Sequence, residues 1–103
     1  MIQLTVITYD GIMAIRVAEM LVDKNLVITA NLFAKVQQCS KKGKEVFLEN
    51  RYMLTAITKG SLFNTIENRL KAEFPAEIFE LSSVPVLNMN WELSDNLINE
   101  DEL

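Results

Sequence analysis

The stretch Ser40-Lys41-Lys42-Gly43-Lys44 stands near the middle of the sequence and has the composition of a tight turn. A glycine among polar and charged residues is typical of the loop between two strands. The residues on both sides are rich in β-branched and other apolar types, from Leu26 to Gln37 before the turn and from Val46 to Ile57 after it. The sequence therefore predicts a long hairpin at the centre of the fold.

A strand and a helix are predicted before this hairpin. Leu4-Thr5-Val6-Ile7-Thr8 is β-rich, and apolar residues then recur at helical spacing from Gly11 to Asp23. Asp10 is a good N-cap for the helix, because its side chain can accept a hydrogen bond from the first turn. Asn25 is predicted to end the helix, because asparagine tolerates the left-handed backbone conformation.

A second helix and a fourth strand are predicted after the hairpin. Gly60-Ser61 interrupts the strand, a helical stripe of apolar residues runs from Leu62 to Phe74, and Pro75 marks its end. A strand follows from Ile78 to Leu87, and Ser94 is the predicted N-cap of a short C-terminal helix. The order predicts an α+β fold, a ferredoxin-like β-α-β-β-α-β sandwich with a short C-terminal helix.

The length and charge limit the classes of protein that the chain can represent. Its 103 residues fit one domain, 1–103, and no window reaches the roughly 18 apolar residues of a membrane span. The N-terminus lacks the basic region of a signal peptide, and a single cysteine fits a reducing compartment, so a cytoplasmic location is expected. The net charge of −4 opposes binding to a phosphate backbone. We therefore expect neither a membrane nor a nucleic-acid partner.

The sequence contains no histidine, which removes the commonest general base together with the usual catalytic triads and most zinc sites. One cysteine cannot build a thiolate zinc cage or an iron–sulfur cluster. The glycines at 11, 43 and 60 are isolated, so no phosphate-cradling motif is present. These absences indicate a binding protein rather than an enzyme, with no certain cofactor.

Two candidate ion sites remain. Glu77 and Glu80 lie three residues apart at a predicted helix-to-strand junction, and hard divalent cations such as Mg²⁺ or Ca²⁺ prefer clustered oxygens. These carboxylates could instead face solvent, pair with Arg51 or Lys71, or in the case of Glu80 be fixed by a neighbouring subunit. Tyr9-Asp10-Gly11 precedes a helix, whose N-terminus could receive a small anion.

Three further features each allow more than one interpretation. Cys39 lies near Lys41, Lys42 and Lys44, and such neighbours favour a reactive thiolate, but the residue could equally be an exposed hairpin residue without a role. The lysines could hold an anion or protect the hairpin against edge-to-edge aggregation. Trp91, the lone tryptophan, is expected to pack the C-terminal helix onto its own chain or onto a neighbouring subunit, and the alternative is that it stacks on a ligand.

The predicted fourth strand is apolar on both faces, which indicates more cover than one chain supplies. Alternation places one set of apolar residues on each side: Ile78, Val84 and Val86 on one, and Phe79, Leu81 and Leu87 on the other. Two helices on one side of a sheet can bury only one of these sets. Another subunit is the simplest source of the missing cover.

The spacing of small and apolar residues resembles that of the CutA family, the small trimeric proteins linked to divalent-cation tolerance. The pattern that carries the resemblance comprises Thr8, Ala14, Ala18, Leu21, Leu26, Asn31, Thr58, Phe63, Ile66 and Leu70. The family segment H-P-Y-x-x-P-E-x-x-x-x-P reads here Phe74-Pro75-Ala76-Glu77-Ile78-Phe79-Glu80, with Pro85 at the family spacing. The resemblance covers nearly the whole chain, mostly in pattern.

This resemblance implies a homotrimeric, non-catalytic binding protein with a role in divalent-cation tolerance or response. Its departures concern the soft-metal ligands: Thr29 stands at the family cysteine implicated in copper binding, Phe74 at the family histidine and Ala76 at the family tyrosine. The family lysine before the strand-closing threonine is Ile57. The alternative is a PII-like structural or signalling module that binds a metabolite or partner protein, although the Ser40 to Lys44 connection is short for its nucleotide-binding loop.

Overall fold

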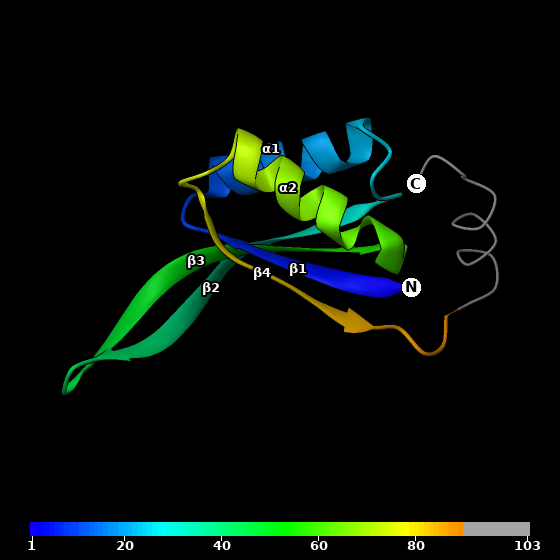
Figure 1. Ribbon diagram of the computed structural model, residues 1–103. Coiled ribbons are helices and arrows are strands. Elements are labelled where there is room, and N and C mark those ends of the chain that lie inside the picture. Colours follow the sequence, from blue (N-terminus) through cyan, green and yellow to red (C-terminus); the bar gives the residue numbers. More distant parts are fainter. Residues whose placement is uncertain (90–103) are drawn as a thin grey trace.

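The computed structural model describes residues 1–89, apart from the side chains at positions 34 and 79. Its elements follow the predicted order (Figure 1): β1 (Ile2–Thr8), α1 (Gly11–Asp23), β2 (Ala30–Lys42), β3 (Glu45–Thr58), the single turn η1 (Gly60–Leu62), α2 (Phe63–Glu73) and β4 (Ile78–Pro85). The predicted C-terminal helix after Ser94, and Trp91, lie outside the described residues.

The four strands form one antiparallel sheet in the order β2-β3-β1-β4. Both helices lie on the same face of this sheet (Figure 1). This arrangement confirms the predicted ferredoxin-like fold. Its consequence for the surface is that β2 and β4 are the two edge strands.

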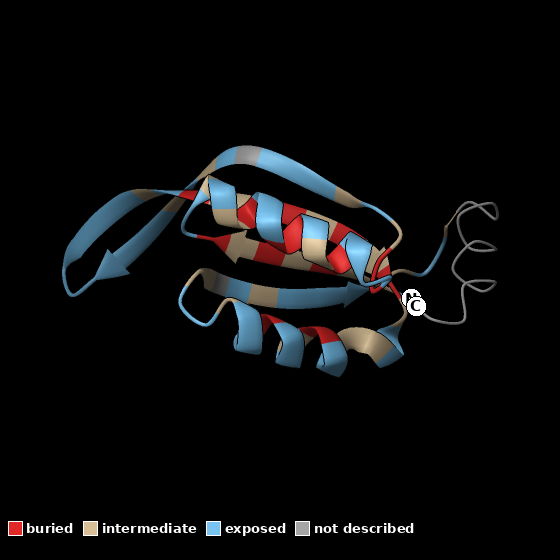
Figure 2. Ribbon diagram, turned by 90° about the horizontal axis from the view of Figure 1, so that it is seen from above, coloured by how far each residue is buried: buried red, intermediate tan, exposed pale blue. Residues whose placement is uncertain are grey.

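The core lies between the helices and the sheet (Figure 2). Alternate residues of β1 are buried, as expected for a strand with one covered face. The fully buried side chains come from both layers: Leu4, Val6 and Leu54 from the sheet, Val17 and Leu21 from α1, and Ile66 and Leu70 from α2. The two helical stripes that the sequence predicts are therefore the ones that face the sheet.

The first helix ends as predicted, but the second strand begins later than predicted. Asn25 has a positive φ of 57°, which confirms its role as the helix stop. Leu26 and Val27 do not join a strand, because their backbone N–H groups both donate to the carbonyl of Leu21 and their side chains are buried. Thr58 Oγ1 donates to the Leu26 carbonyl at 2.6 Å and fixes this connection to β3. The strand therefore starts at Ala30.

The fourth strand does not keep the strict alternation of faces that the sequence predicts. Ile78 and Leu81, predicted on opposite faces, both pack against the core. The cause is a register shift between Ile7 and Thr8 of β1, which turns the start of β4 relative to its remainder. The strand ends at Pro85, and Leu87 beyond it is exposed. Strict alternation is therefore wrong for the start of this strand, while Val84 stays 56% exposed and the predicted cover by a neighbouring subunit stays a prediction.

A different element projects beyond the core. β1 pairs with β3 from Tyr52 to Thr58, so the first half of β3 pairs only with β2. We call this projecting part of the hairpin, residues 36–51, the arm (Figure 1). It exposes apolar side chains, with Val46 65% and Leu48 66% accessible. Its turn is tighter than predicted, since the strands extend to Lys42 and from Glu45, with Gly43 at a φ of 63°.

Candidate functional site

The loop between β1 and α1 places the predicted anion-binding residues at a helix N-terminus. Asp10 is the N-cap, and its Oδ1 accepts a hydrogen bond from the N–H of Ile12 at 2.8 Å. The Thr8 hydroxyl donates to the Asp10 carbonyl at 2.8 Å, which fixes the turn. The carboxylate of Asp10 thus supplies the negative charge that the helix N-terminus favours. An added anion at this position would meet that charge.

Beside this loop lies an apolar hollow of about 490 Å³, which we call the Ile15 hollow. Its walls come from α1, from β2 and from the ring of Tyr52: Asp10, Gly11, Ile12, Ala14, Ile15, Leu32, Phe33 and Tyr52. A Cβ atom on Gly11 would lie 3.1 Å from the Tyr52 ring, so the absence of a side chain there permits the close approach. The hollow therefore depends on the same loop, Tyr9 to Gly11, in which the sequence predicts an anion site.

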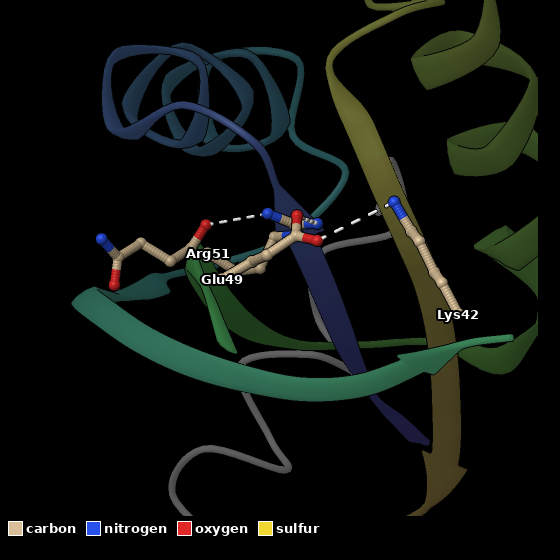
Figure 3. Close-up of polar contacts among 4 residues, drawn as sticks. Lys42, Glu49 and Arg51 are labelled. Carbon is tan, nitrogen blue, oxygen red and sulfur yellow. Dashed lines mark hydrogen bonds and ion pairs between the residues drawn. The ribbon is translucent and has the colours of Figure 1, made fainter. Parts of the chain in front are cut away.

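The sequence does not predict a cluster of charged residues that the structure places on the arm (Figure 3). Arg51 is only 9% exposed, and its Nη2 lies 2.7 Å from Oε2 of Glu49. Its Nη1 donates to the Asn50 carbonyl at 3.0 Å, and the guanidinium stacks 4.8 Å from the centre of the Tyr9 ring. Lys42 Nζ lies 4.0 Å from the other oxygen of Glu49. The cluster joins the arm to the β1–α1 loop.

The charge of Glu49 is stabilised by this environment. The hydrogen bond from Arg51 and its positive charge lower the pKa of Glu49, while partial burial acts in the opposite direction and Lys42 adds a smaller lowering effect. Glu49 and Arg51 are two residues apart in the sequence. In a strand this spacing places the acidic and the basic side chain on the same side, so the pair could have been predicted. The sequence instead offers Arg51 as a partner for Glu77 and Glu80, and the structure pairs it with Glu49.

Backbone contacts place Glu77 and Glu80 near the β1–α1 loop, since Glu80 pairs with Ile7 at the end of β1. The Glu77 carbonyl accepts from Tyr9 N–H at 3.2 Å, and its carboxylate accepts from Ala76 N–H at 3.1 Å. Glu80 accepts from the Ser82 hydroxyl at 3.5 Å. Within residues 1–89, no three residues of the His, Cys, Asp or Glu types group closely enough to hold a metal ion. Each carboxylate thus depends on ligands from elsewhere to bind a cation.

Glu80 also borders a hollow of about 260 Å³ between α2 and β4, together with Lys71 and Phe74. Cys39 is apart from both candidate sites, because it is exposed in the arm opposite Leu48 of β3. The lysines of the arm tip are exposed as well. The structure thus brings the two predicted ion sites to one end of the sheet and leaves the thiol on the arm.

No helix of the described part is long and apolar enough to cross a membrane.

Comparison with protein-family models and with curated protein sequences finds no match. Solved structures, in contrast, resemble this chain over almost their whole length. The CutA1 protein of the psychrotrophic bacterium Shewanella sp. SIB1 superposes with a TM-score of 0.85 at 14% identity, covering 96% of this chain and 92% of that one.

Two further solved structures agree. The divalent cation tolerance protein CutA1 of Thermus thermophilus has a TM-score of 0.80 at 21% identity, covering 94% of this chain and 95% of that one. The periplasmic divalent cation tolerance protein CutA of Archaeoglobus fulgidus has a TM-score of 0.81 at 16% identity, with 97% and 98% covered. The fold of this chain is thus the fold of the CutA proteins, which confirms the resemblance at the level of structure.

Proposed function

We propose that the chain is a divergent CutA-like binding protein that assembles as a homotrimer, catalyses no reaction and acts in divalent-cation tolerance or response in the cytoplasm. The similarity of fold to proteins named for divalent cation tolerance supports this role. The absence of histidine supports a role in binding rather than catalysis, because histidine is the side chain that most often acts as a general acid or base in enzymes.

The exposed apolar side chains of the arm are the observation that best supports assembly as a homotrimer. Val46 and Leu48 are about two-thirds exposed on a part of the hairpin that the body of the chain does not cover. Burying a leucine or valine side chain contributes about 1.5–3 kcal/mol, so a partner that covers the arm gains a substantial free energy. An exposed apolar hairpin also invites aggregation unless a specific partner covers it.

The edges of the sheet supply a way to close the assembly. β2 runs parallel to β1 and β4 antiparallel to it, so the β4 edge of one copy can pair antiparallel with the β2 edge of the next. Such a contact joins two different surfaces, and it forms a ring when the rotation closes. A ring of three copies would leave no edge of this sheet unpaired.

A divalent cation, where bound, would be held by carboxylates. Glu77 and Glu80 supply oxygen donors suited to Mg²⁺ or Ca²⁺, and such ions take about six or more oxygens. One chain offers too few there, so further donors would come from water or from another copy. Copper binding through soft ligands has no support in this chain, because Thr29, Phe74 and Ala76 stand at the family positions.

The alternative of a PII-like signalling module is not favoured by the structure. That class uses a long loop between its middle strands to bind nucleotide, whereas only two residues, Gly43 and Lys44, connect β2 to β3. A nucleotide would therefore have to bind by some other means, and a partner protein would have to recognise another surface.

Mass in solution by light scattering, with and without Mg²⁺, Ca²⁺ and Cu²⁺, tests the proposal together with thermal melts. We expect a trimer in the absence of metal, and a higher melting temperature with Mg²⁺ or Ca²⁺ that the double variant Glu77→Gln and Glu80→Gln loses. Glu19→Gln on the exposed side of α1 is the control, because it removes a carboxylate charge away from Glu77 and Glu80. A monomer at micromolar concentration would refute the assembly. A trimer whose melting is unchanged by each cation would refute the metal role.

A further inference from the structure

The Ile15 hollow collects exposed apolar side chains from two separate elements. Ile12 and Ile15 of α1 are 60% and 48% exposed, and Leu32 and Phe33 of β2 are 48% and 45% exposed. All four line this one hollow. Single exposed apolar residues are normal on a protein surface, whereas a group of them around a concavity is typical of a binding site.

The size and the lining of the hollow fit a small organic molecule. Its volume of about 490 Å³ lies within the usual range of ligand pockets, about 300–1,000 Å³. Gly11 and Ala14 lie one helical turn apart and bring little side-chain volume to the wall that α1 provides. The ring of Tyr52 approaches this wall closely at Gly11. Small residues beside an aromatic ring leave room for a flat apolar group.

Among the described residues that line the hollow, Asp10 alone carries a charge. Its Oδ1 accepts the hydrogen bond from Ile12 N–H at 2.8 Å, which fixes the orientation of the carboxylate. Within residues 1–89, no hydrogen bond or ion pair engages its second oxygen. The hollow therefore offers an apolar surface together with one oriented negative charge.

These two properties restrict the chemistry of the ligand. An inorganic cation would gain nothing from the apolar walls, and an anion would be repelled by Asp10. A molecule that joins an apolar ring to an ammonium group satisfies both. The charge of Asp10 thus reverses the sign of the ion that the sequence predicts for the loop from Tyr9 to Gly11.

We propose that the Ile15 hollow binds a small organic cation, with its ammonium group on the second oxygen of Asp10 and its apolar ring between Ile15, Phe33 and Tyr52. This site is separate from the carboxylates Glu77 and Glu80. It requires neither the ring of three copies nor a divalent cation, so it can fail or hold independently of both.

Isothermal titration calorimetry of the full chain tests the site, with tryptamine as the cationic probe. The alcohol tryptophol and the anion indolepropionate carry the same ring and serve as neutral and negative analogues. We expect saturable binding of tryptamine, weaker binding of tryptophol and none of indolepropionate. Asp10→Asn removes the charge but keeps an equally good N-cap. It should weaken tryptamine binding about ten- to a hundredfold and leave tryptophol binding unchanged.

Asp23→Asn is the matched control, because it makes the same change at the exposed C-terminal end of α1. It should bind tryptamine as the wild type does. Ile15→Lys places a positive charge in the hollow at an exposed position and should abolish tryptamine binding. Circular dichroism verifies that the three variants are folded.

Three results would overturn the inference. The first is an absence of saturable tryptamine binding at millimolar concentration, including the case in which binding appears only on dilution because a second copy covers the hollow. The second is an equal loss of affinity in Asp10→Asn and Asp23→Asn. The third is tryptophol binding as tight as that of tryptamine, which would mean that the charge of Asp10 is not recognised.

Discussion

Replacing Leu48 by alanine separates a role in assembly from a role in the fold of one chain. Leu48 is 66% exposed in the single chain, so its truncation removes little buried surface there. If a neighbouring copy covers the arm, the substitution loses about two-thirds of a full leucine burial. With about 1.5–3 kcal/mol for full burial, the loss is about 1–2 kcal/mol per arm.

Three arms in a ring would together lose about 3–6 kcal/mol of association free energy. This loss corresponds to a factor of about 10²–10⁴ in the association constant, since each 1.4 kcal/mol is tenfold. Because the ratio of trimer to free monomer scales with the square of the free monomer concentration, the midpoint of dissociation should rise about ten- to a hundredfold. Light scattering or sedimentation over a dilution series measures that midpoint.

Leu54→Ala is the matched control, because it deletes the same atoms from the same strand at a fully buried position. It should destabilise the fold of the chain itself by about 3–5 kcal/mol, as core truncations of leucine do. A Leu48→Ala protein whose dissociation midpoint equals that of the wild type would refute the placement of the arm in the interface, whatever the oligomeric state.

Three other outcomes follow from local contacts. Because Arg51 lowers the pKa of Glu49 in the folded chain, their interaction stabilises the protein above the ordinary value of 4.5 and is lost as the pH falls through the lower folded value. The difference in melting temperature between wild type and Glu49→Gln should thus shrink below pH 4.5, and a constant difference would contradict this. Gly43→Ala should cost about 1–2 kcal/mol in a urea titration, because its φ is 63° while nothing lies within 4 Å of the new methyl group. An unchanged midpoint would exclude that strain. Thr58→Val should cost about 1–3 kcal/mol by leaving the buried Leu26 carbonyl without its hydroxyl donor, and thermal melts that match the wild type would refute this.

The order of the helices and strands could be predicted from the sequence, because it depends on the spacing of apolar residues and on the residues that begin and end each element. Asp10 and Asn25 cap α1 through interactions within a few residues of the chain, so their roles were visible locally. The start of β2 was not visible, because Leu26 and Val27 have strand-like side chains but bond to the carbonyl of Leu21. Leu26 and Val27 take this conformation because it buries their side chains against the core, which cannot be seen in the local sequence.

The faces of β4 and the charged cluster depend on contacts between distant segments. Strict alternation predicts opposite faces for Ile78 and Leu81, and the register shift against β1 cancels that alternation. Arg51 and Glu49 could have been paired from their spacing, but the stacking on Tyr9 brings together residues more than forty positions apart. Roles for Glu77, Glu80 and Cys39 stay predictions.

The arm has a consequence for the newly made chain. Its two strands pair only with each other, and a two-stranded hairpin alone is marginally stable in water at best. A dilute chain would therefore spend time with a frayed arm, and its amide protons there would exchange quickly. In the proposed trimer, contact with other copies would order the arm, so the abundance of the protein in the cell would set how much of each chain is folded.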